Sequence, residues 1–222
     1  MFIGHFALGF AAKRVVPTVS LGTLFLAAQL ADLVWPVLVL LGIERVDVSP
    51  GATAFTPLDF VHYPYSHSLV ALLVWALVFA AAYAFSHRAR MNVALTLVAL
   101  VLSHWLLDFL THRADMPLTL GGTTRVGLGL WNSVPGTVLV EGALFVAGVS
   151  FYLKTTQAVD AVGRWSLWAL VAFLTVVYVA NIFGPPPPSA RAVAWTVLGM
   201  WLLVAWGYWI DAHRRQSTRR FG

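Results

Sequence analysis

The sequence predicts an all-α protein, a polytopic transmembrane helical bundle of about six spans plus a short N-terminal helix, forming a single integral membrane domain over residues 1–222. Of the residues, 59% are hydrophobic and only 10% are charged, and the mean hydropathy is +0.80, which is far from the balance of a soluble domain. Six stretches have the ~20 apolar residues that cross a bilayer. The connections between them are too short to hold a soluble domain.

The chain begins with "MFIGHFALGFAAKR", which is apolar first and basic second. This order is the reverse of a signal peptide, and the segment is too short to cross a bilayer alone, so we expect a retained short helix. The stretches expected to span the membrane are 18–42, 67–86, 91–112, 135–153, 165–183 and 191–210. Cysteine is absent, which excludes disulfides, thiolate ligands and a cysteine nucleophile.

The glycine-rich segment 113–134 connects the third and fourth expected spans. It lacks the Gly-Lys-Ser/Thr ending of a nucleotide-binding loop. Because it is also apolar, it could fold back over the helix ends as a lid or a re-entrant segment, which a membrane tolerates when the segment packs on protein.

Basic residues divide unequally between the two ends of an alternating bundle. One end collects Lys13, Arg14, Arg88, Arg90, Lys154, Arg164, Arg214, Arg215, Arg219 and Arg220. The other end has Arg45, Arg113, Arg125 and Arg191. The positive-inside rule makes the first end, with the C-terminus, cytoplasmic. Topology therefore accounts for the net charge of +5, and no nucleic acid partner is expected.

Three titratable residues follow one another at intervals of four in "SHWLLDFLTH": His104, Asp108 and His112. A helix turns about 100° per residue, so these side chains share one face within roughly 80° of arc. Each ionisable group at the centre of a membrane helix costs on the order of 2.5–3.5 kcal/mol on insertion scales, and such groups usually face partners inside the bundle. Three such ionisable groups on one face of a helix therefore need a partner that they can share.

Further polar residues fall at similar depth in the expected topology. Asp32 lies in the first span, Glu141 in the fourth, and His62 and His67 at the outer mouth of the second, while His5 would rise toward the middle of the bilayer. Imidazole and carboxylate are the usual ligands of zinc and related divalent ions. We therefore expect a metal site, and a purely structural polar network or a proton and ion path remains as the alternative.

Other polar residues have simpler interpretations. Ser66 precedes a helix and is expected to cap it. Four acids are expected to be ordinary loop residues, namely Glu44, Asp47, Asp59 and Asp160.

The motifs in the first 120 residues resemble those of a bacterial inner-membrane family described as membrane-bound metal-dependent hydrolases. They are Gly4-His5, Asp32, His62 with His67-Ser68, Ser103-His104 with Asp108, and Pro117-Leu118. That family is similar in turn to the zinc-dependent phospholipase C / P1 nuclease fold, which is all-helical and hydrolyses phosphoesters at a metal cluster. The resemblance implies that the ligand positions are Asp32, His67, His104, Asp108 and Glu141.

The chain departs from these families at several positions. Val34 and Trp35 stand where the hydrolase family often has an acid and a histidine, and "HYPYSH" lacks that family's arginine. Thr137 takes the place of a histidine of the soluble zinc enzymes. We therefore expect one or two ions instead of a trinuclear cluster, with His112 substituting as a local ligand.

These observations predict a membrane-embedded hydrolase with a zinc-like site that opens to the outer side of the bacterial inner membrane. Its metal-activated water would attack a phosphoester or lipid-like substrate. The expected catalytic residues are Asp32, His104, Asp108 and Glu141. The expected metal ligands are His5, Asp32, His62, His67, His104, Asp108, His112 and Glu141. A proton- or ion-coupled transporter and a non-catalytic membrane scaffold remain alternative functions, and the sequence does not specify the oligomeric state.

Overall fold

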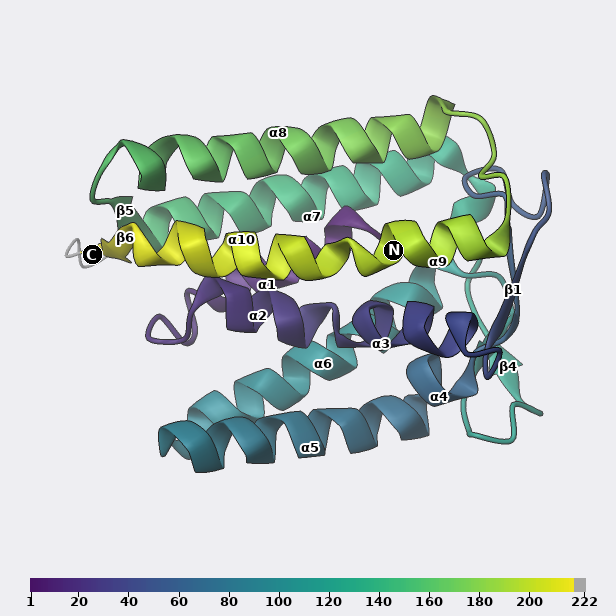
Figure 1. The fold of residues 1–222 in the computed structure, drawn as a ribbon, viewed down its shortest axis with the longest axis horizontal. Helices are drawn as coiled ribbons and strands as arrows, with labels where there is room; N and C mark the ends of the chain where they lie inside the picture. The colour runs from purple at the N-terminus through teal and green to yellow at the C-terminus, as the bar shows by residue number, and fades with distance from the viewer. Residues whose placement is uncertain (218–222) are drawn as a thin grey trace.

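A computed structural model describes residues 1–217, in which helices run side by side along one axis (Figure 1). The α-helices are α1 (Ile3–Ala12), α2 (Leu21–Ala28), α3 (Leu30–Leu40), α4 (Pro64–His67), α5 (Leu69–His87), α6 (Met91–Thr111), α7 (Val134–Thr155), α8 (Ala161–Phe183), α9 (Ala190–Leu198) and α10 (Met200–Ala212). A 3-10 turn, η1, covers Leu130–Asn132. The strands are β1 (Arg45–Val48), β2 (Leu58–His62), β3 (Met116–Pro117), β4 (Arg125–Val126), β5 (Thr156–Ala158) and β6 (Arg214–Gln216).

The predicted fold class, a polytopic transmembrane helical bundle, is confirmed. In the described part of the chain, five helices are long and apolar enough to cross a membrane, with α9 and α10 counted as one run from Ala190 to Ala212. The count rises to six when the bent pair α2 and α3 is taken as one span. The short N-terminal helix is also present as α1.

The first expected span, 18–42, is not one straight helix. Ser20 caps α2 by accepting a hydrogen bond from the Thr23 amide, and α2 ends after Ala28. The chain breaks at Gln29, continues as α3 and bends by 57° between the two helices. Such a break leaves the last carbonyls of α2 without partners inside their own helix.

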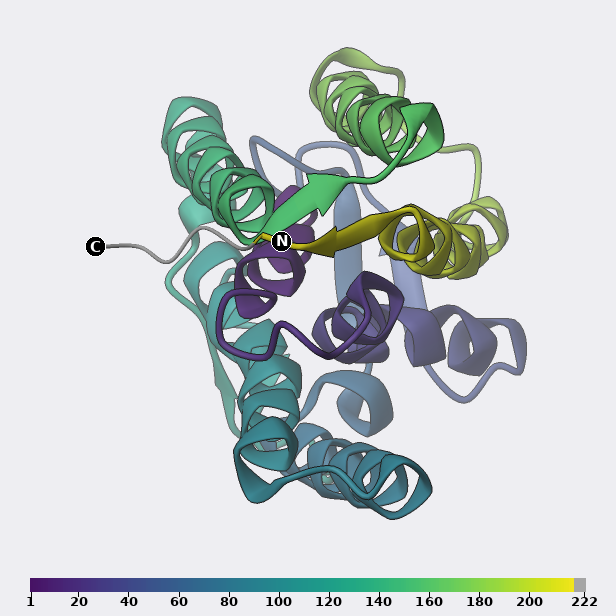
Figure 2. The ribbon, with the colours of Figure 1, turned by 90° about the vertical axis from the view of Figure 1, so that its left-hand side faces the viewer.

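Helix α1 occupies the middle of the bundle, enclosed by other helices when the molecule is seen end-on (Figure 2). It packs against α7, α2 and α6. Gly148 of α7 permits the closest approach, since an added Cβ would lie 2.2 Å from the Ala7 carbonyl oxygen. Small residues at such crossings let membrane helices pack through their backbones. Phe6 and Phe10 of α1 are fully buried against the same neighbours.

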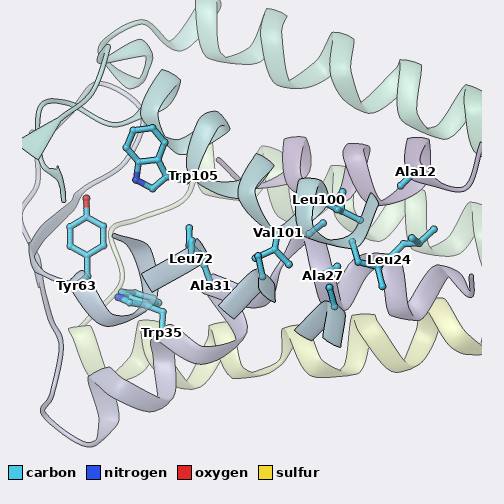
Figure 3. Close-up of a cluster of buried hydrophobic side chains, with 14 of the residues drawn as sticks. Ala12, Leu24, Ala27, Ala31, Trp35, Tyr63, Leu72, Leu100, Val101 and Trp105 are labelled. Atoms are coloured by element: carbon cyan, nitrogen blue, oxygen red, sulfur yellow. The ribbon is translucent and has the colours of Figure 1, made fainter. Parts of the chain in front are cut away.

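A second apolar cluster packs α2 and α3 against α5 and α6 (Figure 3). Leu24 and Ala31 come from the bent pair, Leu72 from α5, and Val101 and Trp105 from α6. The side chains of this cluster hold the bent span beside α6, which carries two of the predicted site residues.

The two long connections contain strands that sequence reasoning did not anticipate. β1 pairs antiparallel with β2, and β3 pairs with β4, at one end of the bundle. The segment 113–134 folds back on α6, because the Leu128 and Gly129 amides donate to the carbonyls of Phe109 and His112. At the opposite end, β5 pairs with β6 (Figure 1). The two expected groups of basic residues lie at these two ends, except Arg219 and Arg220, which lie outside the described residues.

Candidate metal centre

Five of the predicted site residues meet inside the bundle, toward the end that carries β1–β4. They come from four helices: His5 from α1, Asp32 from α3, His67 from α4, and His104 with Asp108 from α6. Four of them are buried, and the Asp32 side chain is 23% exposed. The structure therefore brings together residues more than 100 positions apart in the chain.

Four donor atoms follow one another in a ring, which we call the four-donor ring. His67 Nε2 lies 3.3 Å from Asp32 Oδ1 and 3.8 Å from Asp108 Oδ2. His104 Nε2 lies 3.8 Å from Asp32 Oδ1 and 3.1 Å from Asp108 Oδ2. Four tetrahedral ligands at about 2.0–2.1 Å from an ion are separated from one another by about 3.3 Å. The four neighbouring distances, 3.1–3.8 Å, are close to this separation, and the atoms of Asp32, His67 and His104 lie near enough to one another to hold one ion.

The other ring nitrogen of His104 fixes its tautomer. His104 Nδ1 lies 2.8 Å from the carbonyl oxygen of Ala28, an atom that can only accept, so Nδ1 carries the proton. Nε2 of the neutral ring then presents a lone pair to Asp32 and Asp108. Nε2 is buried and has no hydrogen-bond partner in the described part of the chain. A lone pair facing carboxylates is unfavourable without a cation between them.

His67 is oriented in the same sense by a relay that sequence reasoning missed. Ser66 Oγ lies 2.6 Å from Glu44 Oε2 and 2.7 Å from His67 Nδ1. Because the carboxylate accepts the Ser66 proton, Ser66 Oγ accepts from His67 Nδ1. In the neutral ring His67 Nε2 then carries the lone pair, whereas in the protonated ring it would donate to Asp32 Oδ1 at 3.3 Å. A carboxylate that orients a ligand histidine is a common feature of metal sites.

The relay corrects two expectations about the loop residues. Glu44 is not an ordinary loop acid: it is 2% exposed and its Oε1 accepts from the amides of Tyr65 and Ser66. Ser66 lies inside α4, and Ser68 caps α5 by accepting from the Ala71 amide. Ser66 could have been noticed from its place beside His67, whereas no spacing in the sequence connects Glu44 with His67.

His5 adds a second, overlapping set of ligands. His5 Nε2 lies 3.1 Å from Asp108 Oδ1, and His5 Nδ1 is buried without a hydrogen-bond partner in the described residues. His5, His104 and Asp108 thus form one group that could hold a metal ion, and Asp32, His67 and His104 form another. Since one lone pair of His104 binds one ion, the two groups compete for that residue.

The terminal ammonium of Met1 also contacts Asp108. Two carboxylates buried together need positive charge nearby, because an unpaired buried charge is costly. The ammonium supplies one positive charge beside these carboxylates. A divalent ion would supply two.

His112 belongs to a neighbouring cluster instead of the four-donor ring. His112 Nδ1 lies 2.9 Å from Asp115 Oδ1, which also accepts from the Tyr63 hydroxyl at 3.0 Å. Arg113 holds the other oxygen of Asp115 at 3.2 Å. Burial and the charge of Asp115 raise the pKa of Tyr63 well above its ordinary value. The three-residue spacing of His112 and Asp115 was a signal in the sequence.

The two remaining predicted ligands lie elsewhere. His62 is exposed in β2, with its ring 6.0 Å from that of Tyr65. Glu141 is fully buried, but its Oε2 accepts from the amides of Phe2 at 2.9 Å and Gly4 at 3.2 Å. Glu141 therefore holds the first turn of α1 and lies outside both groups that could hold a metal.

The fold and this cluster define a multi-pass helical membrane protein with buried histidine and aspartate groups that could bind a metal ion. Comparisons of the chain with protein families, with curated proteins and with solved structures give no match. Function is therefore inferred from the residues of this chain.

Proposed function

We propose that the protein is a membrane-embedded, metal-dependent hydrolase. One observation carries the proposal: the Nε2 lone pairs of His67 and His104 converge on Asp32 and Asp108, while their Nδ1 protons are committed to Ser66 and Ala28. A polar network that only fixed helix packing would use these nitrogens to donate hydrogen bonds to the carboxylates. As neutral rings, with Nδ1 carrying the proton, both histidines present an Nε2 lone pair that can accept a cation; as protonated rings they would donate to the carboxylates instead.

The donor set fits one divalent ion of the zinc type, held in the four-donor ring or, alternatively, by the His5 group, because both need the lone pair of His104. A bound divalent ion supplies Lewis acidity, which lowers the pKa of a coordinated water to about 7 and polarises a phosphoryl oxygen. The residues of the chain would hold and orient the ion. His67 and His104 would be neutral ligands, and Asp108 would be the buried carboxylate ligand.

Asp32 has a distinct position, because it is the cluster member with a partly exposed side chain. Water and substrate would reach the cluster at its carboxylate. Asp32 would therefore act as a ligand at the open edge or as the proton acceptor for the attacking water. The expected catalytic role of Glu141 has no contact with this ring to support it.

The substrate we propose is a phosphoester of lipid-like character. The cluster lies inside a bundle whose outer helices are apolar and long enough to span a membrane, so an amphiphilic molecule would be concentrated beside it. By the distribution of basic residues, the cluster would lie toward the outer side of a bacterial inner membrane, with the C-terminus in the cytoplasm. Membrane lipids are thus the proposed partners.

Metal analysis tests the foundation of this proposal. We expect wild-type protein purified without chelators to hold one divalent ion per chain by elemental mass spectrometry. In the double variant His104→Ala, Asp108→Ala, the metal content should fall below about 0.1 ion per chain. Wild type without stoichiometric metal, even after incubation with zinc, would remove the basis for a hydrolase.

Activity and transport are separated by a second experiment. Wild type in vesicles should hydrolyse phosphoester lipids, lose that activity with a chelator and regain it with metal. Ion flux across the same vesicles that depends on His104, without hydrolysis of any phosphoester, would identify a transporter instead. Metal binding without either reaction would identify a scaffold.

A further inference from the structure

A basic cavity lies at the end of the bundle opposite the metal centre, where α5 turns into α6. Its volume is about 540 Å³, within the range of about 300–1,000 Å³ that small-molecule sites have. The α1–α2 connection forms the facing wall. The residues that line it are Val15–Val19, Tyr83, His87–Arg90, Asn92 and Val93.

A second cavity of about 310 Å³ adjoins the first and shares Thr18, Tyr83 and His87 with it. It adds the hydroxyl-bearing residues Ser20, Thr23 and Tyr208 and the apolar side chains of Leu26 and Phe79. No residue that lines either cavity is acidic. The first cavity thus contributes Arg88 and Arg90, and the second contributes apolar side chains.

Arg88 occupies a backbone position that disfavours any residue except glycine. It ends α5 with φ +48° and ψ +42°, the left-handed conformation in which helix ends usually place glycine. In the described chain it is the one non-glycine residue with positive φ. Strained residues concentrate at functional sites, and Arg88 is one of the residues that line the first cavity.

Arg90 shows a similar departure from local preference. It is the N-cap of α6 but makes no capping hydrogen bond with its side chain, so the first amides of this 21-residue helix have no side-chain acceptor. Serine, threonine, aspartate and asparagine are the residues that cap best. Two arginines thus stand where fold stability alone favours other residues, and both line the same cavity.

We propose that the two cavities form a binding site for the headgroup of an anionic phospholipid. The phosphate would sit between Arg88, Arg90 and the uncapped amides of α6, and the glycerol and first acyl carbons would lie on Leu26 and Phe79. The hydroxyls of Ser20, Thr23 and Tyr208 are hydrogen-bonded in a chain, with 2.9 Å from Ser20 to Thr23 and 2.9 Å from Thr23 to Tyr208, and the hydroxyl at one end of that chain would donate to an ester oxygen. This site is independent of the metal centre and of the proposed hydrolase.

The test uses full-length protein in nanodiscs that contain phosphatidylglycerol and phosphatidylcholine in equal amounts. After gentle removal of bulk lipid, native mass spectrometry measures which lipid stays bound. Each arginine near a phosphate contributes about fivefold in lipid preference. We therefore expect wild type to retain phosphatidylglycerol by about tenfold or more over phosphatidylcholine, and the double variant Arg88→Gly, Arg90→Ser to lose that preference.

The substitutions separate binding from folding. Glycine relieves the strain at position 88 and serine caps α6, so the double variant should unfold at the same temperature as wild type or higher. The control Arg164→Gln removes a charge from the start of α8, at the same end of the bundle but outside both cavities, and should change the lipid preference less than twofold. Metal content should be unchanged in both variants.

Three results would overturn the proposal. One is a control that lowers the preference as much as the double variant, which would mean that the general charge of this end attracts lipid. Another is a calorimetric result in which inorganic phosphate binds wild type as tightly as phosphatidylglycerol does. The two cavities would then be a site for free phosphate. Wild type that retains both lipids equally would also contradict it.

Discussion

The imidazole rings of His5 and His104 are parallel, with centroids 3.7 Å apart and 3° between their planes. Two stacked imidazoles at this distance cannot both carry a positive charge without strong repulsion. At least one is neutral, which is the form that binds metal. The stack also connects the central helix α1 to α6 at the proposed metal centre.

The first prediction concerns His5. His5→Ala removes a contact with Asp108 and the stacked partner of His104, so we expect metal affinity to fall roughly 10–100-fold, as it does when groups that orient ligands are lost. Competition with a chromophoric chelator measures the dissociation constant. His62→Ala is the matched control and should bind metal like wild type, because His62 is exposed. Equal affinities for the two variants would place His5 outside the metal centre.

The second prediction concerns the relay from Glu44 to His67. Ser66→Ala leaves the buried Glu44 Oε2 and His67 Nδ1 without their shared hydroxyl, so metal affinity should drop roughly 10–100-fold. Ser66→Thr keeps the hydroxyl and should restore most of it. Ser103→Ala provides a control next to His104, because Ser103 Oγ donates only to the Leu100 carbonyl. A Ser66→Ala variant with wild-type affinity would show that His67 needs no orientation.

The third prediction separates stability from metal binding at Glu141. Glu141→Ala leaves the amides of Phe2 and Gly4 without acceptors in the bundle, and we expect about 1–3 kcal/mol of lost stability. Unfolding titrated with denaturing detergent measures this loss. Metal content should remain at the wild-type level. A stable variant without metal would return Glu141 to the ligand set.

The fourth prediction compares two glycines of α7. Gly148→Ala would place a Cβ 2.2 Å from the Ala7 carbonyl oxygen and should cost typically 1–3 kcal/mol, because neither backbone can move without opening the α1–α7 contact. Gly142→Ala meets no atom within 4 Å and should leave the protein equally or more stable. Thermal unfolding in one detergent gives both values. Similar midpoints for the two variants would contradict the close packing of α1.

The fifth prediction tests orientation. The chain contains no cysteine, so single variants Arg125→Cys and Arg88→Cys report on one position each. In intact cells, a membrane-impermeant thiol reagent should label position 125 and spare position 88 until the membrane is opened. The reverse pattern would turn the proposed metal centre toward the cytoplasm.

The sequence predicted the bundle and most of the ring because both follow from local patterns. Apolar stretches of sufficient length gave the spans, and the four-residue interval put His104 and Asp108 on one face of α6. Glu44 could not be predicted, since its contact with Ser66 depends on how the chain folds between α3 and α4. The interval that suggested His112 was wrong, because α6 ends at Thr111 and His112 is its C-cap in an extended conformation. Asp115 and Tyr63 hold the His112 ring in a separate cluster.

The break at Gln29 determines how deep in the membrane the proposed chemistry can occur. A continuous helix bonds its carbonyls internally and has none to offer a neighbour, whereas the end of α2 leaves the Ala28 oxygen available to His104 Nδ1. The interruption thus sets the level at which a histidine of α6 can be held as a ligand. Moving the break by one turn would shift that level by about 5.4 Å along the bundle and would leave His104 without its anchor.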